Sequence, residues 1–342
     1  KKSTMHDGGV WLGIDLGGTA VKGGIVSGSG QVLQSGKLSH DGKKEPKDVV
    51  NRIVLLAEKL LKDAKLSIKD LEGMGMGAPG GIKNNTVIKA SNFPTWDNVP
   101  LADMVSKKLG IDRVSLINDA DAATAAEFWV GAGASDSTKS LQDLVLITLG
   151  TGVGVGLIVG GRLASGATGT IEGGHHVVCK DGKQCACGQK GCMEMYCSAT
   201  AVVASAKEFL EKHAKATHHF GEKEADPEST SLLRGVEELT CQKIFDAALK
   251  GDHLATDIID NMVEYLAVGC LNFMRILDPA AIVLAGGMCE GESGRLLIKK
   301  LESQLKKITW TCLPTPTKVL LASSGRNSGV VGAVAAGRMM MR

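Results

Sequence analysis

Residues 172–194, EGGHHVVCKDGKQCACGQKGCME, gather thiols, imidazoles and carboxylates between glycines. Cys185 and Cys187 are separated by one residue, Cys192 lies five residues further on, and His175 stands ten before Cys185. Three thiolates and one imidazole form a closed tetrahedral set, which is typical of structural rather than catalytic zinc. The C-x-C spacing argues against a redox pair, which uses C-x-x-C. The spacing therefore predicts a structural Zn²⁺ ion on these four residues, with unrelated free thiols as the alternative.

Further reactive groups flank this set. His176, Cys179 and Cys197 are rival metal ligands that composition alone does not exclude. Glu172 and Glu194 stand at the two ends of the segment. If a metal folds the segment, both carboxylates are carried to defined places, as suits recognition of several hydroxyls on a sugar. Solvated surface glutamates are the alternative.

The motif DLGGT has the composition of a phosphate-binding turn. Asp15 ends an apolar run, and the missing side chains of Gly17 and Gly18 let backbone N–H groups point at an anion. Thr19 supplies a hydroxyl and Lys22 a cation nearby. The motif predicts phosphate binding, with Asp15 organising a hydrated Mg²⁺ ion; an ordinary hairpin turn is the alternative.

A second glycine-rich turn, LGTGVGVG at residues 149–156, is neither a Rossmann fingerprint nor a P-loop. The fingerprint has to open a helix, but the residues after Gly152 read as a strand, and the G-K-[ST] of Walker A is missing. A tip formed by Gly150, Thr151 and Gly152 can still offer N–H groups to phosphate oxygens. Two such tips, one in each half of the chain, could hold a nucleoside triphosphate from opposite sides.

Asn118 and Asp119 follow the apolar run VSLI and precede an alanine-rich helical pattern. The point where a strand meets a helix is the usual ligand edge of an open α/β sheet. The positive helix end favours an ionised carboxylate, so Asp119 could accept a proton from a substrate hydroxyl while Asn118 hydrogen-bonds a neighbouring hydroxyl. A simple N-cap is the alternative, and Asp121 is expected to be the plain cap residue.

These residues have to be positioned by two α/β halves. In the first half, hydrophobic periodicity and turn residues predict strands at 10–14, 21–26 and 31–37, a helix at 49–64, a strand at 71–77 and a helix at 101–109. From residue 141 a second glycine-tipped hairpin begins, followed by helices at 201–213, 242–249 and 255–277 and by the buried strand AAIVLAGG. This similarity indicates a weak internal duplication. The polar residues 215–235 predict a flexible surface insertion.

The length of 342 residues exceeds one hydrophobic core and predicts two domains, 1–118 and 119–327, with a helix at about 328–342 packing back onto the first. The net charge of +2 gives no reason to expect nucleic acid or a membrane surface as partner, so a small molecule is expected. No apolar run is long enough to cross a bilayer or to form a signal peptide. Nine cysteines without an export signal favour reduced thiols or metal ligands and a cytoplasmic location.

Taken together, seven motifs resemble the ROK family in its kinase branch, over about residues 10 to 338: GIDLGGTAVKGGIV, GAPGGI, SNFPTWDNVPL, INDADAATAAE, TLGTGVGVGLIVGGRL, EGGHH with CACGQKGCMEMYCSA, and LDPAAIVLAGG. The resemblance implies an α/β fold of the actin-like ATPase (ribonuclease H-like) type, with two domains and a cleft between them. It implies ATP-dependent phosphorylation of a hexose at its 6-hydroxyl by a homodimer. Glucose is the favoured hexose, and N-acetylmannosamine, fructose, allose and N-acetylglucosamine stay open.

The resemblance also assigns a role to each motif residue. Asp119 corresponds to the catalytic base, and Asn118 to a ligand of the sugar's 3- and 4-hydroxyls. The other sugar contacts are Asn92, Glu172, His175 and Glu194, with Gly80 and Gly81 lining the pocket. ATP and Mg²⁺ are expected at Asp15, Gly17, Gly18, Thr19, Lys22, Gly150, Thr151 and Gly152, with adenosine at Gly286 and Gly287. The zinc set is His175, Cys185, Cys187 and Cys192.

The chain departs from the family pattern at the approach to Glu172. Thr170 and Ile171 stand where ROK members usually carry Ala-Gly, and the approach is one residue shorter, so sugar preference is in question there. ROK members also include sugar-sensing repressors with an N-terminal helix-turn-helix. That domain is not expected here, because DLGGT begins at residue 15 and the charge is near neutral. An enzyme is expected, with a non-catalytic sugar-binding regulator as the alternative.

Overall fold

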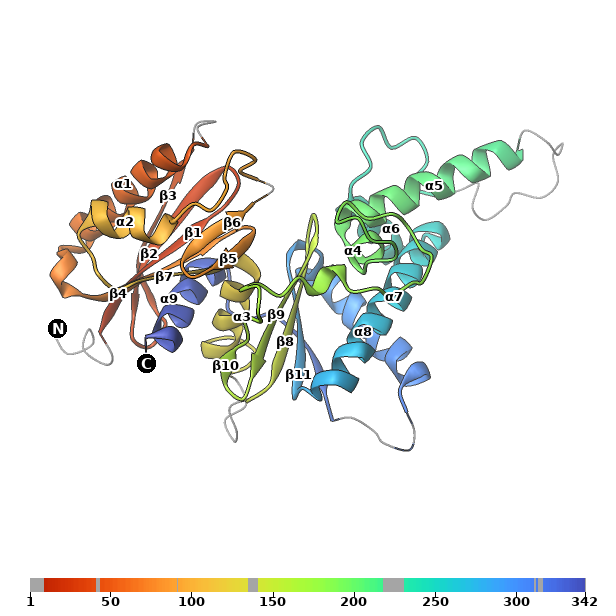
Figure 1. Ribbon diagram of the computed structural model, residues 1–342. Coiled ribbons are helices and arrows are strands. Elements are labelled where there is room, and N and C mark those ends of the chain that lie inside the picture. The colour runs from red at the N-terminus through yellow and green to blue at the C-terminus, as the bar shows by residue number, and fades with distance from the viewer. Residues whose placement is uncertain are drawn as a thin grey trace. The chain divides into compact units, whose positions relative to one another are not determined.

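The computed structural model describes residues 9–40, 44–90, 92–134, 141–217, 231–310, 312 and 316–341 (Figure 1). The chain forms two compact units. The first unit comprises Lys1–Leu146, Gly156–Ile171 and Ala322–Arg342, and the second comprises Ile147–Val155 and Glu172–Leu321. Among the helices in these described ranges, none combines the length and the hydropathy that a bilayer crossing requires.

The first unit is built on a five-stranded sheet in the order β3-β2-β1-β4-β7. The strands β1 (Val10–Leu16), β2 (Ala20–Ser27) and β3 (Val32–Ser39) form the predicted antiparallel meander. The strands β4 (Leu71–Ala78) and β7 (Val114–Asn118) run parallel to β1. The carboxyl ends of β1, β4 and β7 therefore share one edge of the sheet, which is the ligand edge of such folds.

Helices cover both faces of this sheet (Figure 1). On one face α1 (Pro46–Ala64) and α2 (Leu101–Leu109) bury apolar side chains against alternate residues of β1, Leu12, Ile14 and Leu16 among them. On the other face lies α9 (Ser328–Met340), whose Val330 and Val334 pack on Trp11. The helix α3 (Asp119–Trp129), which follows β7 in the chain, packs beside α9. The predicted C-terminal helix is thus a part of the first unit.

Glycines let α9 approach the sheet and α3 closely. A Cβ atom at Gly75 would lie 1.9 Å from the carbonyl oxygen of Ala333, and a Cβ atom at Gly332 would lie 1.7 Å from that of Ala122. Either distance is far below van der Waals contact, so only glycine fits at both positions. This packing keeps α3 in the first unit, whereas the sequence assigned residues from 119 onward to a second domain. The limits of the domains stay a prediction.

A short hairpin that the sequence analysis did not include follows β4. It consists of β5 (Gly81–Lys83) and β6 (Thr86–Lys89). A separate 3₁₀ helix, Ile68–Asp70, precedes β4. Strands of three and four residues with polar tips carry too little periodicity to be recognised from sequence. The hairpin matters because it begins directly after Gly80.

The second sheet has the order β10-β9-β8-β11-β12. Its strands are β8 (Leu144–Leu149), β9 (Val153–Val159), β10 (Arg162–Leu163), β11 (Ala281–Ala285) and β12 (Lys318–Leu321). When the strands of each sheet are numbered along the chain, both sheets read 3-2-1-4-5. The duplication that the two glycine-tipped hairpins indicate is therefore present in the topology.

The second unit also contains five helices within the described residues: α4 (Glu194–Cys197), α5 (Ala199–Thr217), α6 (Cys241–Leu249), α7 (His253–Leu277) and α8 (Gly291–Ile308). Two 3₁₀ helices, Gly173–His175 and Gly287–Cys289, belong to the same unit. The predicted helices at 201–213, 242–249 and 255–277 correspond to α5, α6 and α7, whereas α8 was not predicted. Of the polar segment 215–235, residues 218–230 lie outside the described residues.

Candidate functional site

In the first unit, Asp15 and Lys22 face each other across β1 and β2. The Lys22 Nζ lies 3.3 Å from the Asp15 Oδ2, and the lysine side chain is 53% exposed. An ion pair that is so exposed to solvent contributes little to stability. The turn between them is closed by the Gly17 N–H, which donates to the Ala20 carbonyl at 3.0 Å. The structure therefore presents a carboxylate and an ammonium beside a tight glycine turn, as the phosphate-binding hypothesis requires.

Asn92, a predicted sugar contact, lies against this turn. A Cβ atom at Gly18 would lie 3.1 Å from the Asn92 Cγ. The Asn92 segment is fixed from outside, since the Lys44 Nζ donates to the Asn92 carbonyl at 2.9 Å and the Trp96 indole donates to the Lys44 carbonyl at 2.6 Å. Two residues 74 positions apart in the chain are thus brought together, and Lys44 is a supporting residue that sequence reasoning missed.

Asn118 and Asp119 lie at the end of β7. The Asn118 Oδ1 accepts the Ala120 N–H at 2.8 Å and caps α3, while the Asn118 Nδ2 donates to the Gly80 carbonyl at 2.9 Å. A primary amide has four hydrogen-bonding positions, so two remain for a ligand. Asp119 is exposed in the first turn of α3, where the helix dipole favours a negative charge. The capping interpretation is therefore correct for Asn118, and its contact with a sugar stays a prediction.

The expectation that Asp121 is the cap residue is wrong. A cap residue precedes the helix with an extended backbone, which Asn118 has, whereas Asp121 lies inside the first turn and is 3% exposed.

The turn that reaches Asn118 requires glycine. Gly80 has a φ of +93°, and a Cβ atom there would lie 2.1 Å from the Lys89 carbonyl oxygen. Gly81 has open space where a side chain would project. The structure therefore brings Gly80, Gly81, Asn118 and Asp119 together at the edge that also carries Asp15.

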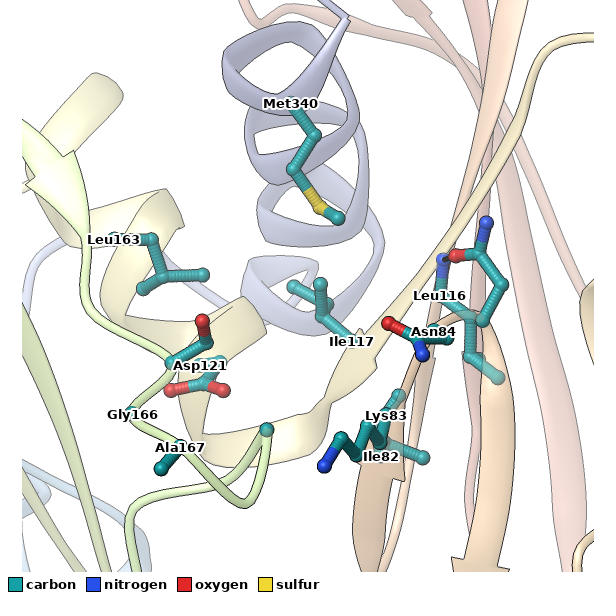
Figure 2. A pocket seen from close by; sticks show the side chains of 13 residues that line it. Ile82, Lys83, Asn84, Leu116, Ile117, Asp121, Leu163, Gly166, Ala167 and Met340 are labelled. Carbon is teal, nitrogen blue, oxygen red and sulfur yellow. Dashed lines mark hydrogen bonds between the residues drawn. The ribbon is translucent and has the colours of Figure 1, made fainter.

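A cavity of about 290 Å³ adjoins these elements within the first unit. Figure 2 shows Asp121 and Leu163 on one side of it, Ile82 on the other, and Met340 from the end of α9. Ile82 lies two residues after Gly80, and Asp121 two residues after Asp119. None of the predicted site residues lines the cavity.

In the second unit, the tip between β8 and β9 carries no charged side chain of its own. The Gly150 N–H donates to the Gly152 carbonyl at 3.0 Å and closes the turn. The start of α5 holds this tip from outside. The Ala199 N–H donates to the Gly150 carbonyl, and the Thr200 hydroxyl donates to the Thr151 carbonyl, each at 2.8 Å. Thr200 is another supporting residue that the sequence analysis missed.

Glu194 also holds this tip. Its Oε2 accepts the Val153 N–H at 2.9 Å, and a Cβ atom at Gly152 would lie 2.5 Å from the same oxygen. Glu194 is half-buried, so the alternative of a solvated surface glutamate does not apply to it. Glu172 by contrast is exposed, and its carbonyl accepts the His175 N–H at 3.0 Å.

The predicted adenosine residues lie beside the same tip. Gly286 has a φ of +95°, and a Cβ atom there would lie 2.3 Å from the carbonyl oxygen of Leu149, the last residue of β8. Gly287 has open space beside it. The second unit therefore places Gly286 and Gly287 next to Gly150–Gly152, an arrangement that suits a nucleotide with its phosphates at the tip.

The predicted metal residues His175, Cys185, Cys187 and Cys192 form one cluster. One ligand atom of each lies within 4.8 Å of the others. The Cys185 Sγ is 3.6 Å from the His175 Nδ1, and the Cys187 Sγ is 3.5 Å from the Cys192 Sγ. A tetrahedral zinc ion with Zn–S bonds of about 2.3 Å separates its ligand atoms by roughly 3.8 Å. The donor set and its spacing fit zinc.

The three rival ligands take no part in this cluster. Cys197 is fully buried with its Sγ 3.7 Å from the Met262 carbonyl, the Cys179 Sγ contacts the Lys180 carbonyl, and the His176 Nδ1 contacts the Gly173 carbonyl. Burial first, and then the neighbouring thiols, raise the pKa of Cys192 to about 12. A divalent cation favours the thiolate form instead.

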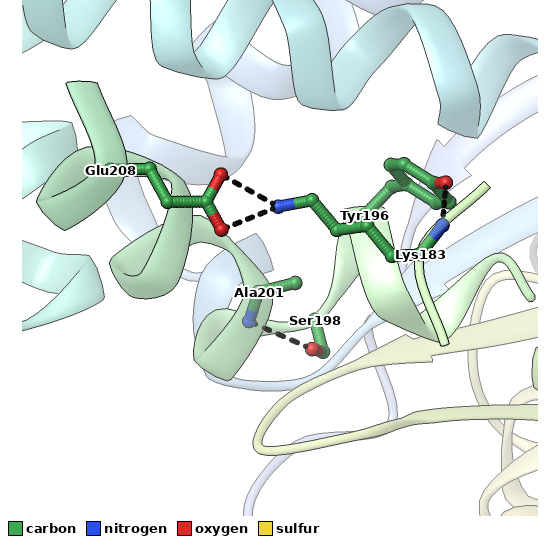
Figure 3. A network of polar contacts seen from close by, with 5 residues as sticks. All are labelled: Lys183, Tyr196, Ser198, Ala201 and Glu208. Carbon is green, nitrogen blue, oxygen red and sulfur yellow. Dashed lines mark hydrogen bonds and ion pairs between the residues drawn. The ribbon is translucent and has the colours of Figure 1, made fainter. Parts of the chain in front are cut away.

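Contacts of the protein itself also shape the loop around the cluster. The loop is anchored on β9 because a Cβ atom at Gly174 would lie 1.9 Å from the Val153 carbonyl oxygen. Figure 3 shows a second anchoring point, near the middle of the loop. The Lys183 N–H donates to the Tyr196 hydroxyl at 2.7 Å, and the Lys183 Nζ lies 3.2 Å from Glu208 on α5. The cluster is thus fastened to α4, α5 and β9.

The geometry of both units can be compared with known proteins. The model of the ROK family matches residues 11–338. The chain belongs to the ROK family. A glucokinase of Thermotoga maritima is 32% identical over 327 residues, which cover 94% of this chain and 95% of that protein. A xylose repressor of Caldicellulosiruptor bescii is 26% identical over 332 residues, which cover 96% of this chain and 78% of the repressor.

Solved structures agree with this assignment. A ROK family glucokinase from Streptomyces griseus, in complex with glucose and AMPPNP, superposes with a TM-score of 0.73 at 29% identity, covering 96% of this ROK chain and 99% of that structure. The structural neighbours include ROK kinases, so the chain has the actin-like ATPase fold, and the predicted α/β fold class is confirmed.

Proposed function

We propose that this ROK chain is an ATP-dependent hexose kinase that phosphorylates the 6-hydroxyl of glucose. The observation that carries the proposal is the placement of Asp119, an exposed carboxylate at the N-terminus of α3 beside Asn118 and Gly80. The 32% identity to a glucokinase over almost the whole chain supports the same activity. A base in that position has the geometry to take a proton from a bound alcohol.

The transfer step follows from these groups. In the first unit, Asn92, Gly80, Gly81 and Asn118 orient the sugar, and in the second unit Glu172, His175 and Glu194 contact its other hydroxyls. The Asp119 carboxylate accepts the proton of the 6-hydroxyl while the sugar oxygen forms a bond to the γ-phosphorus. The bond from that phosphorus to the β,γ-bridging oxygen breaks, and ADP leaves with the electron pair. Positioning and charge neutralisation supply most of the rate in such transfers.

The two tips divide the binding of the nucleotide. Asp15, with Lys22 nearby, would hold the hydrated Mg²⁺ ion, and the N–H groups at Gly17, Gly18 and Thr19 would face phosphate oxygens. In the second unit Gly150, Thr151 and Gly152 contact the other phosphates, and Gly286 and Gly287 hold the adenosine. Magnesium neutralises charge on the phosphates when it is bound.

Zinc has a structural role in this proposal. His175, Cys185, Cys187 and Cys192 would hold it as a closed four-ligand site, which leaves no position for substrate. The bound ion would fix the loop that begins at Glu172 and ends at Glu194, and it would supply no group to the transfer step.

The alternative with a specific observation behind it is a sugar-binding regulator. The xylose repressor of Caldicellulosiruptor bescii covers 96% of this chain at 26% identity, so the sugar-binding framework also serves regulation. A kinase for N-acetylmannosamine, fructose, allose or N-acetylglucosamine is the alternative within the enzyme class. The Thr170–Ile171 departure lies where such a preference would be set.

An assay of sugar-dependent ADP release from MgATP separates these functions. The proposal predicts release with glucose at a higher kcat/KM than with N-acetylmannosamine, fructose, allose or N-acetylglucosamine. Glucose binding in calorimetry without any ADP release over the whole panel would support the regulator instead. Release with one of the other sugars alone would retain the kinase and replace its substrate.

A further inference from the structure

Thr170 is a buried hydroxyl in the first unit that the proposed function does not use. It is 9% exposed, and its Oγ1 accepts the Ile82 N–H at 2.8 Å and lies 3.5 Å from the Ile82 carbonyl oxygen. The two residues are 88 positions apart in the chain. A buried backbone N–H needs a partner, and here one side chain supplies it.

The residues before Thr170 pack tightly on the same strand. Gly169 has a φ of +89°, and a Cβ atom there would lie 2.1 Å from the Ile82 carbonyl oxygen. The Thr168 hydroxyl donates to the Thr170 carbonyl at 3.1 Å, which fixes the backbone locally. The segment 168–170 therefore has one defined position on β5.

Ile82 connects this position to the predicted sugar-binding residues of the first unit. It follows Gly80 and Gly81 directly, and the Gly80 carbonyl accepts the Asn118 Nδ2 at 2.9 Å. Asn118 in turn caps the helix that begins with Asp119. A short path of hydrogen bonds and adjacent residues thus runs from Thr170 to the proposed base.

After Thr170 the chain passes from the first unit into the second. Ile171 ends the stretch Gly156–Ile171 of the first unit, and Glu172 begins the stretch Glu172–Leu321 of the second unit. From there Gly173 and Gly174 pack on β9, where added Cβ atoms would lie 2.7 Å from the Val155 Cβ and 1.9 Å from the Val153 carbonyl oxygen. The segment that bears Glu172 and His175 is therefore fixed on both sides.

We propose that Thr170 is a positioning residue for the acceptor sugar, a role that rests on the proposed kinase function. Its hydroxyl fixes the point from which the Glu172–His175 segment departs, in register with the turn at Gly80 and Gly81. Without the hydroxyl the Ile82 N–H loses its buried partner, so both the turn and the departing segment shift. The nucleotide residues Gly150–Gly152 and Gly286–Gly287 have no contact with Thr170 among the interactions of the described residues.

The test compares T170V, which replaces the hydroxyl by a methyl group, with T170S, which retains it. The role predicts that T170V raises the KM for glucose about tenfold, with the KM for ATP changed less than about twofold, because a buried donor is left unpaired. T170S should restore the glucose KM to within about twofold of the unchanged protein. Calorimetric glucose binding without ATP should show the same ratio.

Thr256 offers a matched control. Its hydroxyl donates to the Asp252 carbonyl at 2.7 Å in the first turn of α7, away from the predicted sugar residues in the chain. T256V also replaces a hydroxyl by a methyl group, but it leaves no backbone N–H unpaired because the Asp252 carbonyl still accepts the Thr256 N–H at 3.0 Å, and it should leave both KM values unchanged. If T170V does not fold, T170A enters the same comparison.

Three results would overturn the role of Thr170. One is an equal rise of both KM values in T170V, and another is a T170S protein as impaired as T170V. The third is unchanged glucose affinity in a folded T170V. Failure of the proposed function is distinguishable from these, because the unchanged protein would then release no ADP with any sugar of the panel.

Discussion

The turn after β1 and the turn after β8 occupy the same position in two sheets of the same strand order, yet they carry different chemistry. The first turn has its own ionic side chains, Asp15 and Lys22, 3.3 Å apart. The second is a bare Gly150–Gly152 tip that is held from outside by Glu194 and Thr200. A duplicated framework therefore fixes where each glycine turn lies, while local residues fix which polar groups the turn carries.

The two turns also differ in how far they depend on residues outside the turn. Each turn closes through a hydrogen bond of its own, from the Gly17 N–H in the first and from the Gly150 N–H in the second. The second turn is held in addition by Glu194, which follows Cys192 of the proposed metal set by two positions. Loss of the metal should therefore disturb the second turn and the Glu172–Glu194 loop while the first turn keeps its shape.

The largest effect is expected from Asp119, which neither turn can replace. In D119N the side chain keeps its size but no longer accepts the hydroxyl proton, so kcat should fall by roughly 10²–10⁴-fold with the glucose KM nearly unchanged. Steady-state kinetics and a thermal unfolding scan measure both. D112N alters an exposed carboxylate before β7 and should keep full activity. Retention of more than about a tenth of kcat in D119N would remove Asp119 from the role of base.

The next largest effect is expected from the cluster that supports the second turn. C185S should lower the zinc content well below about one ion per chain and weaken glucose binding about 10–100-fold, because the loop loses its fixed shape. Elemental analysis and calorimetry with glucose measure these changes independently of turnover.

C179S is the matched control for C185S, since Cys179 lies in the same loop but outside the cluster. It should retain the zinc and the glucose affinity of the unchanged protein. Zinc loss in C179S, or normal glucose affinity in a zinc-free C185S protein, would contradict the account of the loop.

A smaller and more specific effect is expected at the first turn. D15N removes the negative charge that is proposed to hold hydrated Mg²⁺ and should raise the Mg²⁺ concentration for half-maximal activity about tenfold, in line with the strength of hydrogen bonds to charged groups. A titration with Mg²⁺ at fixed ATP measures the change. The KM for glucose should stay within about twofold. An unchanged Mg²⁺ titration would show that the two turns do not differ as described.

The smallest effect is expected at Thr200, whose exposed hydroxyl donates one neutral hydrogen bond to the second turn. T200V should raise the KM for ATP about threefold, because such bonds contribute about 0.5–1.5 kcal/mol. T309V removes the same type of bond at the end of α8 and should have no effect on the KM. A rise in the glucose KM alone would assign Thr200 to the sugar instead.

Much of the framework could be predicted from the sequence because it depends on local patterns. Alternation and turn residues predicted the meander of β1 to β3, and helical periodicity predicted α1 and α5 to α7. The four residues His175, Cys185, Cys187 and Cys192 do lie together, as predicted, because spacing, residue type and glycine turns all agree within one short segment; the zinc ion itself stays a prediction. The hairpin of β5 and β6 was missed since its strands are too short to show a period.

The rest depends on contacts between distant residues. Glu194 and Val153 are 41 positions apart, and Thr170 and Ile82 are 88 apart, so no local pattern predicts either bond. The error at Asp121 has a different cause, because several polar residues in one segment satisfied the preference for a cap. Only the backbone conformation at Asn118 decides between them. The sequence thus named candidate site residues, whose roles stay predictions, but it did not identify the residues that support them.

The central claim is that this ROK chain transfers the γ-phosphoryl group of ATP to the 6-hydroxyl of glucose. Phosphorus NMR of the protein with MgATP and ¹³C-labelled glucose tests it most directly. The account predicts one phosphorylated sugar, glucose 6-phosphate, formed in a ratio of about one to ADP, as the balanced transfer requires. Phosphate on another hydroxyl, or ADP with free inorganic phosphate and unchanged glucose, would contradict it.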